Sequence, residues 1–336
     1  MQLIKTLPDS PEIDDIAKVP GELFPDNIPL QMESQYVNRL HLLHGYLLRD
    51  GGQVLGGIAL YDNPGHFLHG ERACCAGYFH CVNDVAAASQ LIEAVKKDVA
   101  ALGIKHLIGP MNGTTWENYR FRTSDGPPAF FLESPHPVYY NDLFMACGFQ
   151  PIKTYYSFLV KPLRPMDERA LKRERELLQK GIAIRHINPE NYADDMRKIY
   201  DLCLISFKDN FLYTPYPWEA YIAKYRLLEG LNDPRMTVIA EHEGQVVGFV
   251  FMINDYLCED EKRVVFKTYA VHPAAKYAGL GAVISQRLTQ DLLDEGYASA
   301  IHAYVIEGST SLNSSSKDSE VYRTYKLYAL NVNHGA

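Results

Sequence analysis

The sequence predicts a mixed α/β fold that is used twice in tandem, each time as a mixed sheet flanked by helices. Three observations support this prediction. The chain has 336 residues, about twice the length of a typical domain. A charged stretch divides it near the middle, and the elements predicted on the two sides follow a similar order. We therefore expect a first domain over residues 1–162, a linker helix over 163–180 and a second domain over 181–336.

The composition, 47% hydrophobic and 22% charged, is that of an ordinary globular protein. The net charge of -8 makes nucleic acid a poor partner and fits a small or cationic substrate better. The cysteines form no CxxC pair and the histidines show no metal-ligand spacing, so we expect reduced, buried thiols and no metal. No signal sequence and no apolar run of about 20 residues is present, which predicts a cytoplasmic protein without a membrane segment.

In the second half, alternating apolar residues predict strands, and apolar residues three and four positions apart predict helices. The predicted strands cover residues 181–187, 236–241, 245–255, 263–271 and 299–306. The predicted helices cover residues 192–207, 218–228 and 282–295.

The first half can be described in the same terms. A strand pair turns at Gly51-Gly52, a strand covers ERACCAGYFHC, a helix covers residues 85–102 and a strand covers IKHLIGP. A further helix over residues 139–146 stops at Gly148.

The most informative segment is YAVHPAAKYAGLGA, residues 269–282. A strand delivers the chain to Pro273, which blocks continued pairing, and a loop with Gly279 and Gly281 then opens a helix without side-chain bulk. The backbone N–H groups of residues 277–282 can therefore converge on an anion at the helix N-terminus. A pyrophosphate fits there.

This pattern resembles the acetyl-CoA loop of the GNAT superfamily of N-acetyltransferases, whose signature is Gln or Arg, two residues, Gly, any residue, then Gly or Ala. Lys276 stands where Gln or Arg is usual, which keeps a donor and a positive charge near phosphate. The resemblance implies acetyl-CoA or another acyl-CoA as cofactor, with the backbone of Ala270 and Val271 pairing with the pantetheine arm. It implies further cofactor contacts at Lys276, Tyr277, Ala278, Gly279, Leu280, Gly281, Ala282 and, beyond the last strand, Asn313.

The first half lacks this loop. Its stretch GYFHCVNDVAAASQ has no glycine between Asn83 and the body of the helix, and Asp84 places a carboxylate where phosphate would lie. This half does carry a copy of the family's ending, a helix with Tyr140 followed by Gly148 and Phe149, which the second half lacks. We expect the first domain to be a degenerate copy that does not bind CoA.

Nearly the whole chain resembles a group of uncharacterised tandem acetyltransferase-like bacterial proteins, through GPMNGTTWENYR, VHP with the glycine loop, DNFLYTPYPWEAY and YRTYKLYAL. The long segment 109–135 is too rich in Gly, Pro and aromatic residues to be a simple connection. Its side chains could form a substrate wall or could simply pack between domains. The substrate-binding candidates are Trp116, Tyr119, Arg120 and, from the later segment, Phe211.

The resemblance implies direct attack of an amine on a thioester, with a general base taking the ammonium proton. Candidates for the base are Glu241 and Asp255 at strand ends and Tyr269 on the strand that enters the loop, and no motif favours any of them. Solvated strand ends explain both carboxylates equally well. Tyr322 is the first candidate for the acid that protonates the departing thiolate, although strand packing also accounts for it.

Three functional hypotheses remain open. The leading one is an N-acyltransferase acting on the amine of a small molecule or amino acid, as a monomer or homodimer. The second is an aminoacyl transferase like the tandem peptidoglycan-bridge enzymes, which use charged tRNA; the acidic composition and the CoA-type loop argue against it. The third is a protein that binds acyl-CoA without turnover, which the missing Gly-Phe helix and unassigned base would allow.

Overall fold

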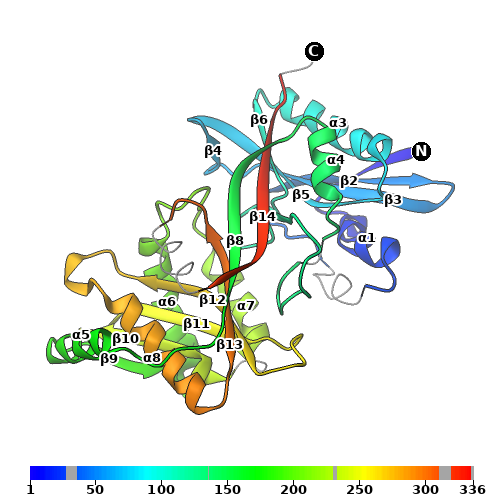
Figure 1. The fold of residues 1–336 in the computed structure, drawn as a ribbon. Helices are drawn as coiled ribbons and strands as arrows, with labels where there is room; N and C mark the ends of the chain where they lie inside the picture. The colour runs from blue at the N-terminus through cyan, green and yellow to red at the C-terminus, as the bar shows by residue number, and fades with distance from the viewer. Residues whose placement is uncertain (28–35, 135, 230–232, 310–318, 334–336) are drawn as a thin grey trace. The chain divides into compact units, whose positions relative to one another are not determined.

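The computed structural model describes residues 1–27, 36–134, 136–229, 233–309 and 319–333. The chain forms two compact units that do not follow a single cut in the sequence (Figure 1). Unit 1 comprises Met1–Tyr155, Leu212–Thr214 and Arg323–Ala336, and unit 2 comprises Tyr156–Phe211 and Pro215–Tyr322.

Unit 1 is built on a mixed sheet in which the strands follow the order β1, β2, β3, β5, β6, β14, β8. The bounds are β1 Gln2–Thr6, β2 Leu42–Asp50, β3 Gln53–Tyr61, β5 Glu71–Cys81, β6 His106–Gly109, β8 Gln150–Val160 and β14 Glu320–Asn331, with short strands β4 Phe67–Leu68 and β7 Phe121–Arg122. The helices are α1 Asp15–Leu23, α3 Val85–Ala101 and α4 Tyr140–Ala146. Only the β5–β6 pair is parallel among the pairings described for this unit.

Two glycines of β3 show how the sheet of unit 1 is covered. A methyl group on Gly56 would meet Leu91 of α3, and one on Gly57 would meet Val19 of α1. Because successive residues of a strand point to opposite faces, α1 and α3 lie on opposite faces of the sheet. The glycines allow both helices to approach the strand closely.

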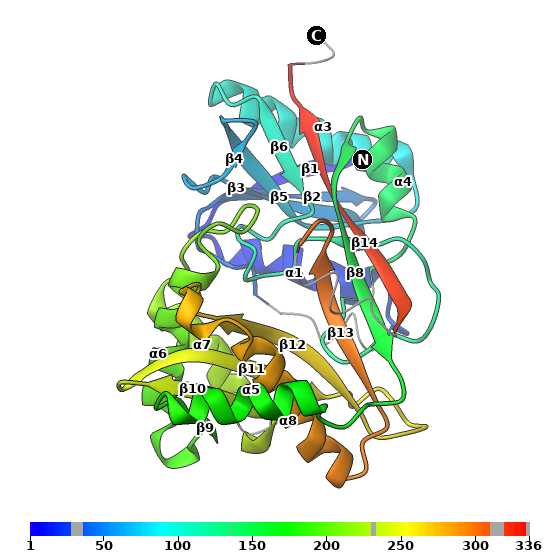
Figure 2. The ribbon, with the colours of Figure 1, turned by 60° about the vertical axis from the view of Figure 1, so that its left-hand side comes forward.

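Unit 2 has the strand order β8, β13, β12, β11, β10, β9. The strands are β9 Ala183–His186, β10 Thr237–His242, β11 Gln245–Asn254, β12 Arg263–Val271 and β13 Ser299–Ile306, and β8 contributes its residues after Tyr155. The helices are α5 Glu168–Gln179, α6 Tyr192–Ser206, α7 Trp218–Glu229 and α8 Leu280–Asp294. Helices α5 and α8 lie side by side on one face of this sheet, and α6 and α7 cover the other (Figure 2).

The strands and helices predicted around the glycine loop are present, and β12 and β13 have the predicted bounds. The units differ from the predicted domains at four places. Residues 156–162 belong to unit 2 and Leu212–Thr214 to unit 1, and two longer segments also differ. The residues expected to form a linker helix give α5, which is part of unit 2 because Glu174 pairs with Arg287 of α8 at 2.8 Å and Leu177 is buried in the core. The segment Arg323–Ala336, expected in the second domain, belongs to unit 1.

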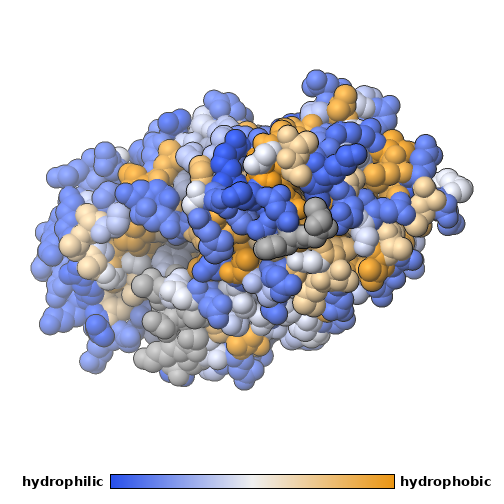
Figure 3. Space-filling model, turned by 90° about the horizontal axis from the view of Figure 1, so that it is seen from above, coloured by the Kyte–Doolittle hydropathy of each residue, from blue (hydrophilic) through white to orange (hydrophobic). Residues whose placement is uncertain are grey.

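The cysteines are free, as expected, but Cys147 and Cys258 are only half-buried. Within the described part of the chain, no helix has the length and apolar character needed to cross a membrane. The face shown in Figure 3 is mainly hydrophilic, and its hydrophobic residues form small separate groups.

Among its described residues, unit 1 buries five histidines, and burial lowers the pKa of three of them strongly. Burial lowers the pKa of His66 to about 4 and that of His136 to about 3, and it holds the pKa of His80 well below its ordinary value. Each ring is therefore neutral in the folded protein at pH 7. The unfolded chain protonates them near pH 6.5.

We predict that stability falls as the pH drops below about 6.5, because the unfolded state then binds more protons than the folded state. Each histidine contributes about 1.4 kcal/mol per pH unit between its unfolded and folded pKa values. Thermal unfolding followed by circular dichroism between pH 8 and pH 4.5 checks this, with His80→Leu as the comparison. Below pH 6.5 the melting temperature of the variant should fall less steeply with decreasing pH than that of the wild type. An equal pH dependence of the two melting temperatures would contradict the conclusion that His80 is neutral in the folded protein.

Candidate functional site

Strand β12 pairs with its two neighbours over different lengths. Its parallel register with β13 runs from Arg263 to Phe266, which lies opposite His302. Its antiparallel register with β11 continues to Val271, with a bulge at Lys267. The two parallel strands therefore part after Phe266, and the following residues of β12 have an edge that β13 does not cover.

The direction of the backbone groups along this edge follows from the hydrogen bonds to β11. The N–H of His272 donates to the carbonyl of Val247 at 2.8 Å, and such pairs alternate along an antiparallel ladder. The backbone groups of Ala270 therefore face β11, whereas those of Tyr269 and Val271 face the uncovered edge. This corrects the expectation that Ala270 offers its backbone to a pantetheine arm, and it keeps Val271 in that position. The carbonyl of Val271 also accepts a hydrogen bond from Ser206 Oγ at 3.2 Å.

The loop after β12 ends in a helix that has no side-chain cap. Gly279 is the N-cap residue of α8, with φ of 82° in the left-handed region, and no side chain bonds to the first turn. The first N–H groups of an α-helix have no partner inside the helix. Gly279 and Ala282 are exposed, while Leu280 between them is anchored in the core. The helix start therefore presents backbone donors to an anion, as the spacing of the glycines predicts.

The remaining loop residues have separate roles. Tyr277 is buried, and its hydroxyl lies 3.0 Å from Nδ1 of His242, so its side chain fixes the loop to the core. Lys276 is exposed, with Nζ 4.9 Å from the centre of the Tyr277 ring. A methyl group on Gly281 would lie 3.3 Å from Val271 and 3.6 Å from the Tyr269 ring, so glycine here allows α8 to approach β12 closely.

Arg173 of α5 is a further residue of this site that the sequence analysis did not identify. Its guanidinium donates from Nε and Nη2 to the carbonyl of Ala278, at 3.0 and 2.6 Å. It also pairs with Glu176 at 2.9 Å. A fixed positive charge therefore lies directly beside the start of α8. No local pattern indicated Arg173, because the helix that carries it was predicted to be a linker.

Unit 1 contains the same arrangement, but its own side chains fill it. Asp84 is the N-cap residue of α3, and its Oδ1 accepts hydrogen bonds from the N–H groups of Ala86 and Ala87 at 2.6 and 3.0 Å. The carboxylate thus takes the donors that an anion would need, as the sequence predicts for this half. Strands β5 and β6 also part, after Cys75 opposite Ile108.

The edge of β5 that this parting exposes is occupied by the chain itself. The N–H of Met111 donates to the carbonyl of Ala76 at 2.7 Å, and that of Tyr78 donates to Asn112 Oδ1 at 2.8 Å. The backbone of Tyr78 is strained, with φ of 46°. The Asn112 amide therefore pairs with β5 at the level where, in unit 2, the edge of β12 is uncovered.

The predicted catalytic carboxylate Glu241 lies in an ion-pair network. It accepts from Arg185 at 2.8 Å and from Lys198 at 3.3 Å, and the Arg185 guanidinium holds its pKa below the ordinary value. It is on β10, two strands away from β12. Asp255 is likewise held by Arg263, at 2.7 Å in a buried pair. Both carboxylates therefore have a structural role in ion pairs, and neither lies at the uncovered edge of β12.

The two predicted tyrosines lie at opposite ends of β12. Tyr269 is on the uncovered edge, partly exposed, with its side chain toward α8. Tyr322 is buried beside Arg263, whose guanidinium carbon lies 5.4 Å from the centre of its ring. The structure therefore brings Tyr269, but not Tyr322, to the glycine loop. Asn313 lies outside the described residues.

The predicted substrate-binding residues are divided between the two units. Tyr119 and Arg120 line a pocket of unit 1, where the Arg120 guanidinium lies 3.9 Å from the Tyr119 ring centre and 4.9 Å from that of Tyr155. Trp116 donates from Nε1 to the carbonyl of Thr214, also in unit 1. Phe211 is half-buried in the connection between α6 and α7 and belongs to unit 2.

His302 is a second residue that the sequence analysis missed. It is the last residue of β13 in register with β12, and its ring centre lies 4.9 Å from that of Phe266. Burial lowers the pKa of His302 to about 4, so the ring is neutral at pH 7. The sequence shows that a histidine lies within the predicted strand 299–306. It does not show at which residue this strand parts from its neighbour.

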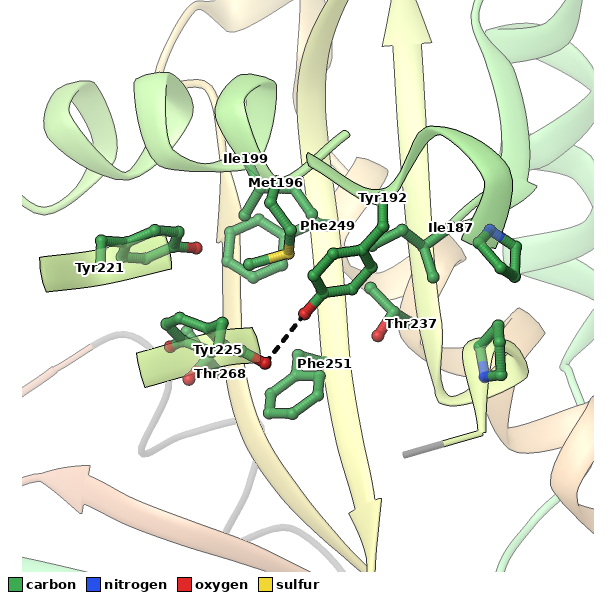
Figure 4. A pocket seen from close by; sticks show the side chains of 12 residues that line it. Ile187, Tyr192, Met196, Ile199, Tyr221, Tyr225, Thr237, Phe249, Phe251 and Thr268 are labelled. Atoms are coloured by element: carbon green, nitrogen blue, oxygen red, sulfur yellow. Dashed lines mark hydrogen bonds between the residues drawn. The ribbon is translucent and has the colours of Figure 1, made fainter. Parts of the chain in front are cut away.

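An apolar pocket with a cavity volume of about 60 Å³ lies on the face of the unit 2 sheet that α6 and α7 cover (Figure 4). Side chains from β10, β11 and β12 form its floor, and side chains from the two helices form its roof. The lining residues are Ile187, Pro189, Tyr192, Met196, Ile199, Tyr221, Tyr225, Pro234, Thr237, Phe249, Phe251 and Thr268.

Comparison with known proteins agrees with this geometry. Residues 194–312 match the model of the acetyltransferase (GNAT) family. The chain is 21% identical over 179 residues to a bacterial ceramide synthase from Caulobacter vibrioides, a match that covers 53% of this chain and 46% of the relative. The chain thus spans about half the length of the curated relative it matches.

Two solved structures resemble nearly the whole chain. One is a GCN5-related glucosamine N-acetyltransferase region of a fungal multidomain β-N-acetylglucosaminidase, with a TM-score of 0.58 and 12% identity, covering 98% of this chain and 38% of that one. The other is a tandem GNAT protein from the clavulanic acid biosynthesis pathway, with a TM-score of 0.53 and 11% identity, covering 100% and 99%. At these identities the likeness establishes the fold. The match to the acetyltransferase (GNAT) family model lies within the part of the chain that carries the uncapped helix and the uncovered strand edge.

Proposed function

We propose that unit 2 binds acyl-CoA and transfers the acyl group to the amine of a small molecule or amino acid. The observation that carries this proposal is the combination of an uncapped helix α8 with the uncovered edge of β12 directly before it. The donors at the helix start suit a diphosphate, and the strand edge suits an amide-containing arm. Both features belong to the matched GNAT segment.

The residues present fit such a cofactor. The backbone N–H groups from Gly279 to Ala282 would hold the diphosphate, and Arg173 and Lys276 would offset its charge. The outward backbone groups of Tyr269 and Val271 would hydrogen-bond with the pantetheine amides. In unit 1, Asp84 and Asn112 take the equivalent positions, so the proposal assigns the cofactor to unit 2 alone.

When bound, acyl-CoA supplies a thioester whose acyl carbon the amine nitrogen attacks, so that a C–N bond forms and the C–S bond breaks. The amine must lose a proton and the departing thiolate must gain one. Neutral His302 can accept a proton where the two strands part, and the Tyr269 hydroxyl can donate one at the strand edge. The name of the Caulobacter relative, a ceramide synthase, supports amide formation.

Turnover is tested by incubating the purified full chain with acetyl-CoA and a panel of amines and amino acids, and by measuring thiol release and the acylated product by mass spectrometry. Product formation with any amine supports the proposal. Tight CoA binding without product across the panel would favour a non-catalytic binding protein. Failure to bind any CoA species would overturn both and return the aminoacyl-transfer hypothesis to the front.

We predict that Ala282→Glu weakens CoA binding by about tenfold or more, because a carboxylate at the start of α8 repels the diphosphate. The same substitution should leave folding intact, since Ala282 is exposed and an acidic side chain in the first turn favours the helix. Isothermal titration calorimetry measures the affinity. Ala282→Gln, which has the same size and no charge, is the matched control and should bind nearly as well as the wild type. Equal affinities for Glu and Gln would contradict the placement of the diphosphate.

We predict that Arg173→Ala weakens CoA binding by about tenfold and reduces its dependence on salt, because one charged donor beside the phosphates is lost. Lys172→Ala removes an exposed charge from the same helix and is the control. Titrations at low and high ionic strength separate the two variants. If both lose affinity equally, the effect belongs to the net charge of α5 rather than to Arg173.

A further inference from the structure

We propose that the apolar pocket beneath α6 and α7 receives the alkyl chain of a fatty acyl group carried by CoA. The inference rests on the proposed function and extends it, because it makes the preferred donor a medium-chain acyl-CoA rather than acetyl-CoA. It depends on the shape of the pocket floor, on the chemistry of the lining and on the position of Thr268.

The floor of the pocket runs across three strands in register. Thr237 of β10 lies opposite Phe251 of β11, and Phe251 lies opposite Thr268 of β12. Neighbouring strands are spaced by about 5 Å, so this row is about 10 Å long. Ile187 and Pro234 extend the lining beyond Thr237. A pocket that is elongated across the strands suits a linear chain.

The roof and the lining are hydrocarbon and aromatic. Met196 and Ile199 of α6 face Tyr221 and Tyr225 of α7 above the strands (Figure 4). The hydroxyl of Tyr192 is engaged, since it donates to the carbonyl of Tyr225 at 3.2 Å. None of the twelve lining residues is charged. A cationic amine would find no carboxylate in this pocket, whereas a hydrocarbon chain would lose contact with water.

One end of the row lies at the strand edge assigned to the pantetheine arm. Thr268 lines the pocket, and its neighbour Tyr269 carries its side chain toward α8 and its backbone groups toward the uncovered edge. An arm that pairs with β12 from Val271 toward Tyr269 would bring its thioester to the level of Thr268. The acyl group could then continue from Thr268 toward Thr237, on the face of the sheet opposite α8.

The first test is the affinity of the wild-type protein for CoA esters of increasing length, from acetyl through butanoyl, hexanoyl and octanoyl to decanoyl, by isothermal titration calorimetry. Each buried methylene should strengthen binding by about fourfold until the pocket is full. Acetyl-CoA that binds as tightly as octanoyl-CoA would overturn the inference and leave the proposed function standing. Loss of binding to every ester would instead reject the proposed function.

The second test shortens the pocket from its far end. Thr237→Phe should weaken octanoyl-CoA binding by at least tenfold while acetyl-CoA binding stays within twofold of the wild type, and Thr237→Val, which hardly changes the volume, is the control. If Thr237→Phe does not fold, Ile199→Phe is the alternative variant. It fills the pocket from the roof and should also shift the preference toward shorter acyl chains. The inference would be overturned if neither variant changed the preferred acyl length. It would also be overturned if the two variants weakened binding of octylamine but not of octanoyl-CoA.

Discussion

The arrangement of unit 2 depends on the parting of two parallel strands. Beyond Phe266 and His302, β12 continues beside β11 but not beside β13, and the strand edge that results carries backbone donors and acceptors. Backbone groups that no neighbouring strand pairs with bond to side chains, water or a ligand, as the Val271 carbonyl does with Ser206 Oγ. The bulge at Lys267 and the glycines of the following loop bring this edge directly to the N-terminus of α8. A strand edge and a helix start thus become one continuous set of hydrogen-bonding groups.

Unit 1 shows what happens when the chain fills the same set by itself. Asp84 caps α3, and Asn112 bonds to β5 where β5 and β6 have parted. Both contacts stabilise unit 1 without a ligand, because they satisfy donors that would otherwise need water or an anion. The difference between the units lies mainly in which side chains stand at these points. A glycine at the helix start leaves the donors available, and an aspartate uses them.

The sequence was sufficient for the parts of the site that depend on local spacing. The strand 263–271, Pro273 and the two glycines predict a strand, a loop and a helix start, and the bounds of β12 are as expected. Asp84 likewise acts as its position suggests. The residues that depend on long-range packing were not predictable in this way. Arg173 reaches the loop only because α5 packs against α8, and the parting at His302 depends on strand register, which leaves no local pattern.

Two of the predicted catalytic residues lie away from the glycine loop for a related reason. Glu241 and Tyr322 were chosen because they lie near strand ends or near a loop in sequence, but Glu241 is held by Arg185 and Tyr322 lies at the far end of β12 beside Arg263. Ion pairs and strand direction are properties of the folded sheet. The backbone of Ala270 illustrates the same limit on a smaller scale. Its neighbour Val271 faces the uncovered edge, and a change of one residue reverses the direction of the hydrogen bonds.

The most direct test of this account is hydrogen–deuterium exchange of the full chain, measured by mass spectrometry with and without CoA. The account predicts slower exchange in peptides that cover residues 269–283, at the edge of β12 and the start of α8. Peptides that cover residues 78–88 of unit 1 should be unchanged, because Asp84 and Asn112 already bond to the equivalent groups. Protection of residues 78–88, or no protection of 269–283, would contradict the assignment of the cofactor to unit 2.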